Sequence, residues 1–191
     1  MRTFTRWIMV AGMVSSCSAP QAPFDEAAAI ARGGEIAKFT FQQLSTRLQG
    51  AMAEGGPVGA LRYCAVAALP LVDSLSAVHG VRIKRTSDRV RAPWDMPDAD
   101  EQRQLNEVLA KLAQGVKPMD LPAQALVLGD SIAYYQPILI SMPTCLKCHG
   151  TPGLEVDEAT MALLAERYPG DAATGYAVGD LRGLWSIRWK R

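Results

Sequence analysis

The chain has 191 residues, with 20 lysines and arginines against 19 aspartates and glutamates, so its formal net charge at pH 7 is +1. A nucleic-acid partner would favour a basic surface, and this near-balance gives no basis for one. The length suffices for one domain with a hydrophobic core. Only four cysteines and two histidines are present, so the positions of these few residues are informative.

The N-terminus resembles an export signal. Arg2 and Arg6 precede a short apolar stretch, Trp7 to Val14, which ends in Ser15, Ser16 and Cys17. This pattern predicts a signal peptide over residues 1–16 rather than a membrane span. Cys17 at the cleavage point resembles the lipidated first residue of a bacterial lipoprotein. The alternative is an ordinary signal peptide that is cut near Ala19 or Ala22.

These features predict a mature protein on the periplasmic side of a bacterial membrane, with the outer membrane favoured over the inner one. The lipid on Cys17 would anchor it, since several acyl chains hold a protein on a bilayer. Residues 17–23 would form a tether, and residues 24–191 a single domain.

Helical periodicity comes first in the domain. It predicts helices over residues 24–49 and 58–78, separated by a break at residues 50–57. Gly33 and Gly34 interrupt the first helix, and Pro70 should kink or restart the second. A third helix begins at Asp98, with Glu101 at capping-box spacing, and stops at Gly115. A fourth, short helix follows Asp157.

Alternating patterns predict the strands. They cover residues 81–85, 125–128, 132–141 and 183–190. Pro137 should demote the third strand to a sheet edge or place a bulge in it. In the last strand Trp185, Ile187 and Trp189 should face inward. The expected fold is therefore α+β, a small antiparallel sheet flanked by helices, with a long N-terminal helix.

The segment Cys145-Leu146-Lys147-Cys148-His149 holds half of the cysteines and half of the histidines. Two thiols three residues apart can reach both vinyl groups of a porphyrin, while the next imidazole binds the iron. The pattern predicts one covalent haem c, with Cys145 and Cys148 as thioether anchors and His149 as an axial ligand. The alternatives are a dithiol redox pair, a zinc site and a strained structural disulfide.

The position of this motif argues against two familiar haem folds. Class I cytochromes c carry it near the N-terminus with a methionine ligand well downstream, whereas here Met161 is the sole methionine after His149. The four-helix cytochromes c′ carry it on a helix that almost ends the chain. Here another predicted helix and a strand follow it.

Further segments lie in a fixed order around the motif, spanning roughly Ala60 to Trp189. They are Cys64, Arg85-Thr86-Ser87, Arg91-Ala92-Pro93, Pro97-Asp98 with Glu101, Tyr135-Gln136-Pro137-Ile138, Tyr168-Pro169-Gly170-Asp171, Ala173-Thr174-Gly175-Tyr176 and Gly179-Asp180-Leu181-Arg182-Gly183. With Cys145 to Gly150 they resemble the Tll-like haem-binding domain, a family of exported c-type haem proteins with a PAS-like fold. The resemblance implies that Cys64 is the second axial ligand. Its position on an apolar helix face would by itself indicate a packing role.

Other candidate residues have less specific signals. Arg85 shares a strand face with Val81 and Ile83 and is a candidate partner for a haem propionate, although the basic run from Arg82 to Arg91 also fits a solvated strand face. His79 at a helix end fits a helix-dipole partner better than a ligand. The methionines are expected in the core or in loops, and Trp185, Trp189 and Tyr135 in the core or against haem.

The expected function is electron transfer by a mono-haem c-type cytochrome with an unidentified redox partner protein. The alternative is a haem-based redox or gas sensor that signals through a separate partner. Enzymatic activity is not expected, because a haem peroxidase needs an open iron position and Cys64 would fill it. A homodimer is possible through the helix over residues 24–49.

Overall fold

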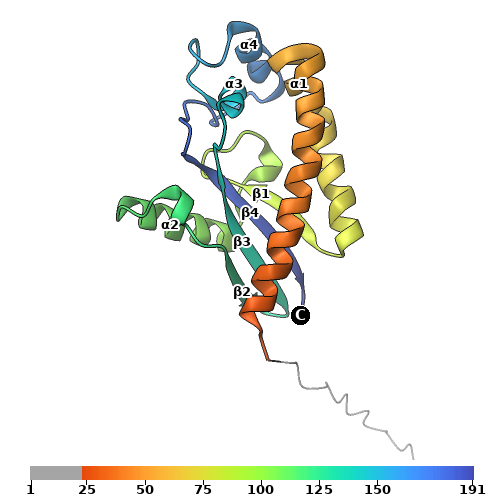
Figure 1. Ribbon diagram of the computed structural model, residues 1–191, viewed down its shortest axis with the longest axis vertical. Coiled ribbons are helices and arrows are strands. Elements are labelled where there is room, and N and C mark those ends of the chain that lie inside the picture. Colours follow the sequence, from red (N-terminus) through yellow and green to blue (C-terminus); the bar gives the residue numbers. More distant parts are fainter. Residues whose placement is uncertain (1–22) are drawn as a thin grey trace, which may run out of the picture.

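A computed structural model describes residues 23–191, which form helices around one sheet (Figure 1). The predicted signal peptide, the lipidation site Cys17 and nearly all of the tether lie outside the described residues. The helices are α1 (Glu26–His79), α2 (Ala99–Ala113), α3 (Leu146–His149) and α4 (Glu158–Arg167), and the strands are β1 (Arg82–Thr86), β2 (Gln124–Leu128), β3 (Ser131–Leu139) and β4 (Leu181–Lys190). Three short 3-10 helices, η1 (Pro93–Asp95), η2 (Pro118–Asp120) and η3 (Pro143–Cys145), connect them.

Helix α1 is a helical hairpin. Gly56 has φ 60° and ψ −159°, a conformation that favours glycine, and the chain reverses there before Pro57 starts the second segment. The second segment, residues 57–79, runs back beside the first (Figure 1), and the rings of Phe39 and His79 lie 5.6 Å apart, edge to face. The predicted break between the two helices, at residues 50–57, is confirmed. Only Gly56 within α1 has non-helical dihedral angles. Dihedral angles stay helical through Pro70, so the helix does not restart there.

The glycine pair in the first segment does not interrupt the helix, contrary to the expectation. Gly33 is buried, and a Cβ there would collide with the ring of Tyr134 on β3, whereas Gly34 has room. The missing side chain therefore lets the helix backbone approach the sheet closely.

The sheet is antiparallel, with strand order β1-β4-β3-β2. The prediction of β3 as an edge strand is wrong, because β3 lies between β4 and β2. The alternative of a bulge holds, since the register with β4 shifts at Ile138/Leu139. Pro137 is tolerated inside the sheet because β2 begins at Gln124, opposite Tyr135, and does not extend as far as Pro137. Pro137 therefore has a neighbouring strand only on the β4 side.

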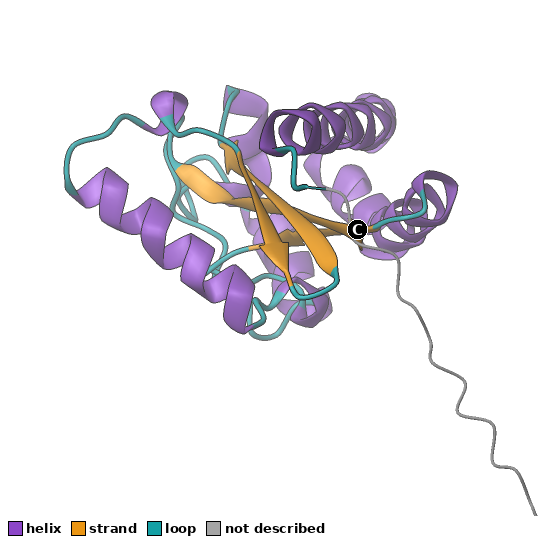
Figure 2. Cartoon of the chain, turned by 90° about the horizontal axis from the view of Figure 1, so that it is seen from below, coloured by secondary structure: helices purple, strands orange, loops and turns teal. Residues whose placement is uncertain are grey.

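Helices cover both faces of the sheet (Figure 2). Trp185, Ile187 and Trp189 are buried with α1 on one face, which confirms their predicted inward orientation. Leu184 precedes Trp185 on β4, so its side chain lies on the other face of the sheet, where it is buried with Leu105 of α2. The predicted α+β class, a small antiparallel sheet flanked by helices with a long N-terminal helix, is confirmed.

Among residues 23–191, α1 alone contains an 18-residue window with the length and composition to span a membrane, and only 17% of that window is buried. The same helix carries the core residues Ala60, Leu61, Val72 and Leu75. This combination leaves an apolar helix partly uncovered.

Candidate functional site

The Cys-x-x-Cys-His segment forms one short helical turn at the end of the sheet. Helix η3 leads directly into α3, and Gly150 closes the turn with a hydrogen bond from its N–H to the Leu146 carbonyl, at 2.8 Å. A Cβ on Gly150 would lie 2.7 Å from both the Glu155 Cβ and that carbonyl oxygen. Spacing of three residues on a helical turn directs Cys145 and Cys148 to the same side.

The His149 ring is fixed by a backbone carbonyl. Its Nδ1 lies 2.7 Å from the Ala173 oxygen, and because a carbonyl only accepts, Nδ1 must carry the proton and donate it. Burial, together with the charges of Arg91, Arg182 and Arg85, holds the pKa of His149 well below its ordinary value. The imidazole is therefore neutral at pH 7, with the Nε2 lone pair free for a metal.

A loop from Asp171 to Tyr176 packs against the motif. The Gly175 N–H donates to the Gly150 carbonyl at 2.7 Å, and the Tyr176 N–H donates to the His149 carbonyl at 2.9 Å. The Tyr176 ring also meets the His149 ring edge to face, with centroids 6.1 Å apart. The loop thus holds the backbone and the ring of His149 together.

Arg91 joins this loop to the motif. Its Nη2 donates to the Cys148 carbonyl at 2.6 Å and to the Ala173 carbonyl at 3.2 Å, and its guanidinium pairs with Asp171 at 2.9 Å. Both side chains of the pair are nearly buried, at 11% and 9% exposed. Arg91 and Asp171 belong to the quoted family segments, but sequence reasoning assigned neither a role.

Cys64 lies on the second segment of α1, on the side that faces α3 and α4. Leu61, one turn earlier, is buried against Leu163 and Leu164 of α4. Burial raises the pKa of the Cys64 thiol, and the charges of Arg85 and Arg91 oppose that rise. Cys64 also contributes to the raised pKa of Cys148, after burial. Because α1 also contacts α3, Cys64 and the motif lie near each other although they are far apart in the sequence.

Arginines gather beside the motif. Arg85 and Arg91 act on both His149 and Cys64, and burial together with these two arginines lowers the pKa of Arg182. Arg89 stacks its guanidinium 4.0 Å over the Tyr176 ring. Mutually repelling cations in a partly buried site favour an anionic ligand.

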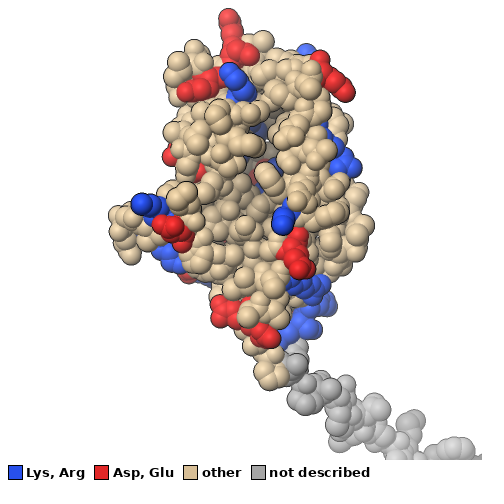
Figure 3. Space-filling view, in the orientation of Figure 1, with Lys and Arg blue, Asp and Glu red and all other residues tan. Residues whose placement is uncertain are grey.

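The space beside the motif is open. Figure 3 shows a hollow between α1 and the segment that carries α3, with basic side-chain atoms visible inside it. The side chains around this hollow fit haem c with its two propionates. They comprise two thiols on one turn, a neutral imidazole with a free Nε2, a third thiol on α1 and the surrounding arginines.

The other candidate residues lie elsewhere. His79 ends α1 against Phe39, and its Nε2 has no hydrogen-bond partner within residues 23–191. Trp185 and Trp189 are core residues of the α1 face, and Tyr135 belongs to the α2 face. Three methionines are exposed: Met119 lies in η2, and Met96 and Met142 lie in loops beside η1 and η3.

The basic run is a solvated strand face only in part, because Arg82 is exposed whereas Lys84 and Arg91 are nearly buried. Lys84 on β1 pairs with the fully buried Glu101 of α2 at 2.6 Å, and Arg91 pairs with Asp171. Arg85 lines a cleft together with Ile83 and with Leu69 and Val72 of α1, which places it on the α1 side of the strand. The prediction that Arg85 shares the face of Ile83 is thus supported by its surroundings.

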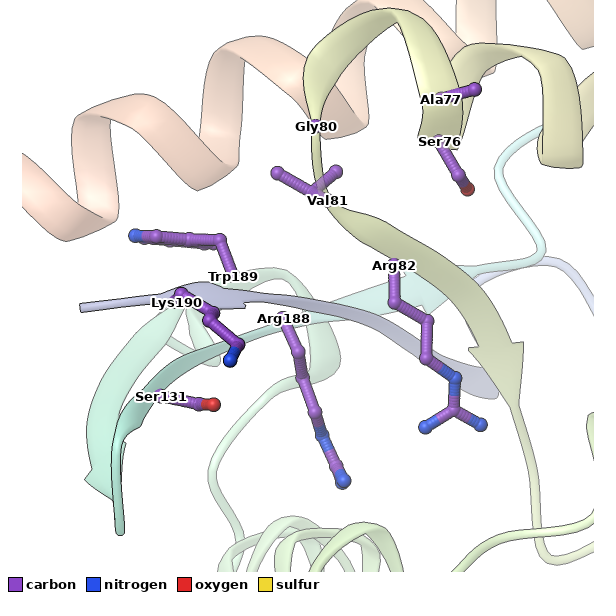
Figure 4. Close-up of a pocket in the computed structure, with 9 residues that line it drawn as sticks. All are labelled: Ser76, Ala77, Gly80, Val81, Arg82, Ser131, Arg188, Trp189 and Lys190. Carbon is purple, nitrogen blue, oxygen red and sulfur yellow. The ribbon is translucent and has the colours of Figure 1, made fainter.

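An open cleft lies at the opposite end of the sheet (Figure 4). Arg82 and Arg188 stand opposite each other in the β1–β4 register and point away from α1, whereas Trp189 lies on the α1 side. Both arginines pair with Asp98, at 3.9 and 2.9 Å. This carboxylate neutralises part of their charge, and the cleft contains none of the predicted ligands.

The zinc alternative finds no support in the described chain. No three His, Cys, Asp or Glu side chains between residues 23 and 191 are grouped as a metal ion would require. A structural zinc site needs four such ligands.

Comparison with known proteins shows to which family the chain belongs. The family model described as Tll0287-like matches residues 16–189. A search among curated proteins finds no match. The solved structure described as the crystal structure of the cyanobacterial heme-protein Tll0287 is 23% identical, with a TM-score of 0.60, and the alignment covers 83% of this chain and 94% of that one. The chain has the same fold, and it belongs to the Tll0287-like family.

Proposed function

We propose that the chain is a haem-binding protein that carries one covalent haem c and transfers electrons. Cys145 and Cys148 would form the thioether bonds, and His149 and Cys64 would be the protein ligands to the iron. The observation that carries this proposal is the contact from His149 Nδ1 to the Ala173 carbonyl, which frees Nε2 on the same turn that presents both thiols. The haem-protein relative, which shares the fold, supports the same function.

The protein residues each have a role in this proposal. Arg91 and the loop 171–176 orient His149, while Arg85 and Arg182 offer charge to the propionates. When bound, the haem supplies a one-electron couple between ferric and ferrous iron. Thiolate from Cys64 adds negative charge at the iron, which favours the ferric state and lowers the potential. Because His149 and Cys64 would both bind the iron, we propose no enzymatic activity.

The place of action is part of the same proposal. Export would bring the chain to the compartment in which haem is attached, and lipidation at Cys17 would hold it on the periplasmic side of a membrane, outer rather than inner. A separate redox protein would exchange electrons with it.

Haem is expected to remain with the polypeptide after acid-acetone extraction. Thioether bonds survive the treatment, whereas iron ligation alone does not. The measurement is the haem absorbance of the precipitated protein, and the double variant Cys145→Ala/Cys148→Ala is expected to release whatever haem it binds. Extraction of the haem from the unaltered protein would overturn the covalent attachment.

The ferric protein is expected to show a low-spin spectrum with thiolate character that disappears in Cys64→Ala. The matched control is Val66→Ala, on the same helix but on its exposed side, which should leave the spectrum unchanged. An unchanged spectrum in Cys64→Ala would exclude Cys64 as a ligand. Carbon monoxide should bind the reduced variant but not the reduced unaltered protein, and binding to the latter would favour the gas-sensor alternative.

A further inference from the structure

The second segment of α1 carries exposed apolar residues on the side of the helix opposite Cys64. Val66 is 70% exposed and Leu69 is 36% exposed. At 100° per residue, Val66 lies about 200° around the helix from Cys64, and Leu69 about 140°. This surface is therefore distinct from the side that carries Cys64. Val66 projects from it, whereas Leu69 and Asp73 also border a cleft that residues of β1 and η1 line.

A charged residue lies at each end of this surface, and the two charges are opposite in sign. Arg62 lies one turn before Val66 and Asp73 one turn after Leu69, and both are exposed. Neither forms an ion pair with any residue of the described chain, 23–191. The four positions follow the spacing i, i+4, i+7 and i+11, which places them on one face of a helix. We name Arg62, Val66, Leu69 and Asp73 the α1 stripe.

The α1 stripe is complementary to itself. If a second copy packs antiparallel about a twofold axis between residues 67 and 68, Arg62 faces Asp73 of the partner subunit and Val66 faces Leu69 of the partner subunit. The same axis repeats both contacts, so the dimer gains two ion pairs around an apolar centre. A parallel pairing would instead set each charge against its own copy, which is unfavourable.

We propose that this protein forms an antiparallel homodimer through the α1 stripe. The proposal goes beyond the haem function and does not depend on it. It also differs from a dimer through residues 24–49, because the complementary charges lie on the second segment. A lipid surface is a poorer occupant, since nothing in it matches a stripe that ends in one cation and one anion.

The test is sedimentation velocity on the haem-loaded full chain over a wide range of concentration. The unaltered protein is expected to dimerise. Arg62→Asp and Asp73→Arg should each raise the dimer Kd by about tenfold or more, because each sets two like-charge pairs across the interface. The double variant Arg62→Asp/Asp73→Arg restores the pairing in reverse and should return the Kd close to its original value. Val66→Glu should give a monomer.

Controls separate this interface from general effects. Glu107→Lys reverses an exposed charge on α2, outside the stripe, and should leave the Kd unchanged. The haem spectrum should be the same in all variants, which checks that each is folded. A monomer at every concentration would overturn the proposal, as would failure of the double variant to recover. Binding of the monomer to phosphatidylglycerol vesicles that Val66→Glu abolishes would assign the stripe to a membrane instead.

Discussion

Arg91→Ala is expected to lower the free energy of unfolding by about 3–5 kcal/mol, the range typical of breaking a buried ion pair from one side. The substitution leaves the Asp171 carboxylate nearly buried without its cation. It also removes the donor to the Cys148 and Ala173 carbonyls. The Ala173 carbonyl also accepts the hydrogen bond from His149 Nδ1. Without Arg91 to hold this carbonyl, the His149 ring should lose its fixed orientation as well.

Two measurements check this prediction. Urea unfolding gives the loss of stability, and the haem content per chain gives the effect on the site, which should fall. The matched control is Arg103→Ala, which removes an ion pair with Asp100 whose side chains are 65% and 33% exposed. Exposed pairs contribute about 0–1 kcal/mol, so this control should be nearly neutral. Equal effects of the two substitutions would contradict the assigned role of Arg91.

The local part of the site could be predicted from the sequence. Cys145, Cys148 and His149 are adjacent in the chain, and one helical turn fixes how they relate. The capping box of α2 is also local, and Asp98 and Glu101 form it as expected. The alternation in β4 indicated its inward face correctly.

Long-range contacts account for what the sequence missed. Arg91 reaches Asp171 about 80 residues away, and no periodicity relates two such positions. The same limit explains the error at Pro137. Proline inside a strand indicates a missing ladder hydrogen bond. The sequence does not reveal that β2 pairs with β3 only as far as Tyr135, so that no strand lies beside Pro137 on the β2 side.

Cys64 is an intermediate case. Its helix face was predictable, yet that face alone indicated packing. Its relation to the motif depends on the reversal at Gly56, which turns the second segment of α1 back along the sheet. The glycine and proline at residues 56 and 57 indicated a break but not the direction of the chain beyond it.

The buried pair of Lys84 and Glu101 provides the second large prediction. Glu101 is fully buried, and Lys84 supplies its shortest ion pair, at 2.6 Å, while Arg188 lies 3.8 Å from its other oxygen. Lys84→Met keeps the length of the side chain but removes the cation. We expect the free energy of unfolding to fall by about 3–5 kcal/mol, measured by urea unfolding, because the carboxylate stays buried with a weaker partner.

The double variant Lys84→Met/Glu101→Met distinguishes loss of charge pairing from loss of packing. Removing both charges takes away the desolvation cost, so part of the stability should return, although the capping contact from Glu101 to the Asp98 N–H, at 2.9 Å, is also lost. A coupling free energy of about 1–3 kcal/mol between the two substitutions is expected. Strict additivity would mean that the two residues stabilise the α2 face independently. The haem spectrum of the folded variants should not change, because this pair lies on the sheet face opposite α1.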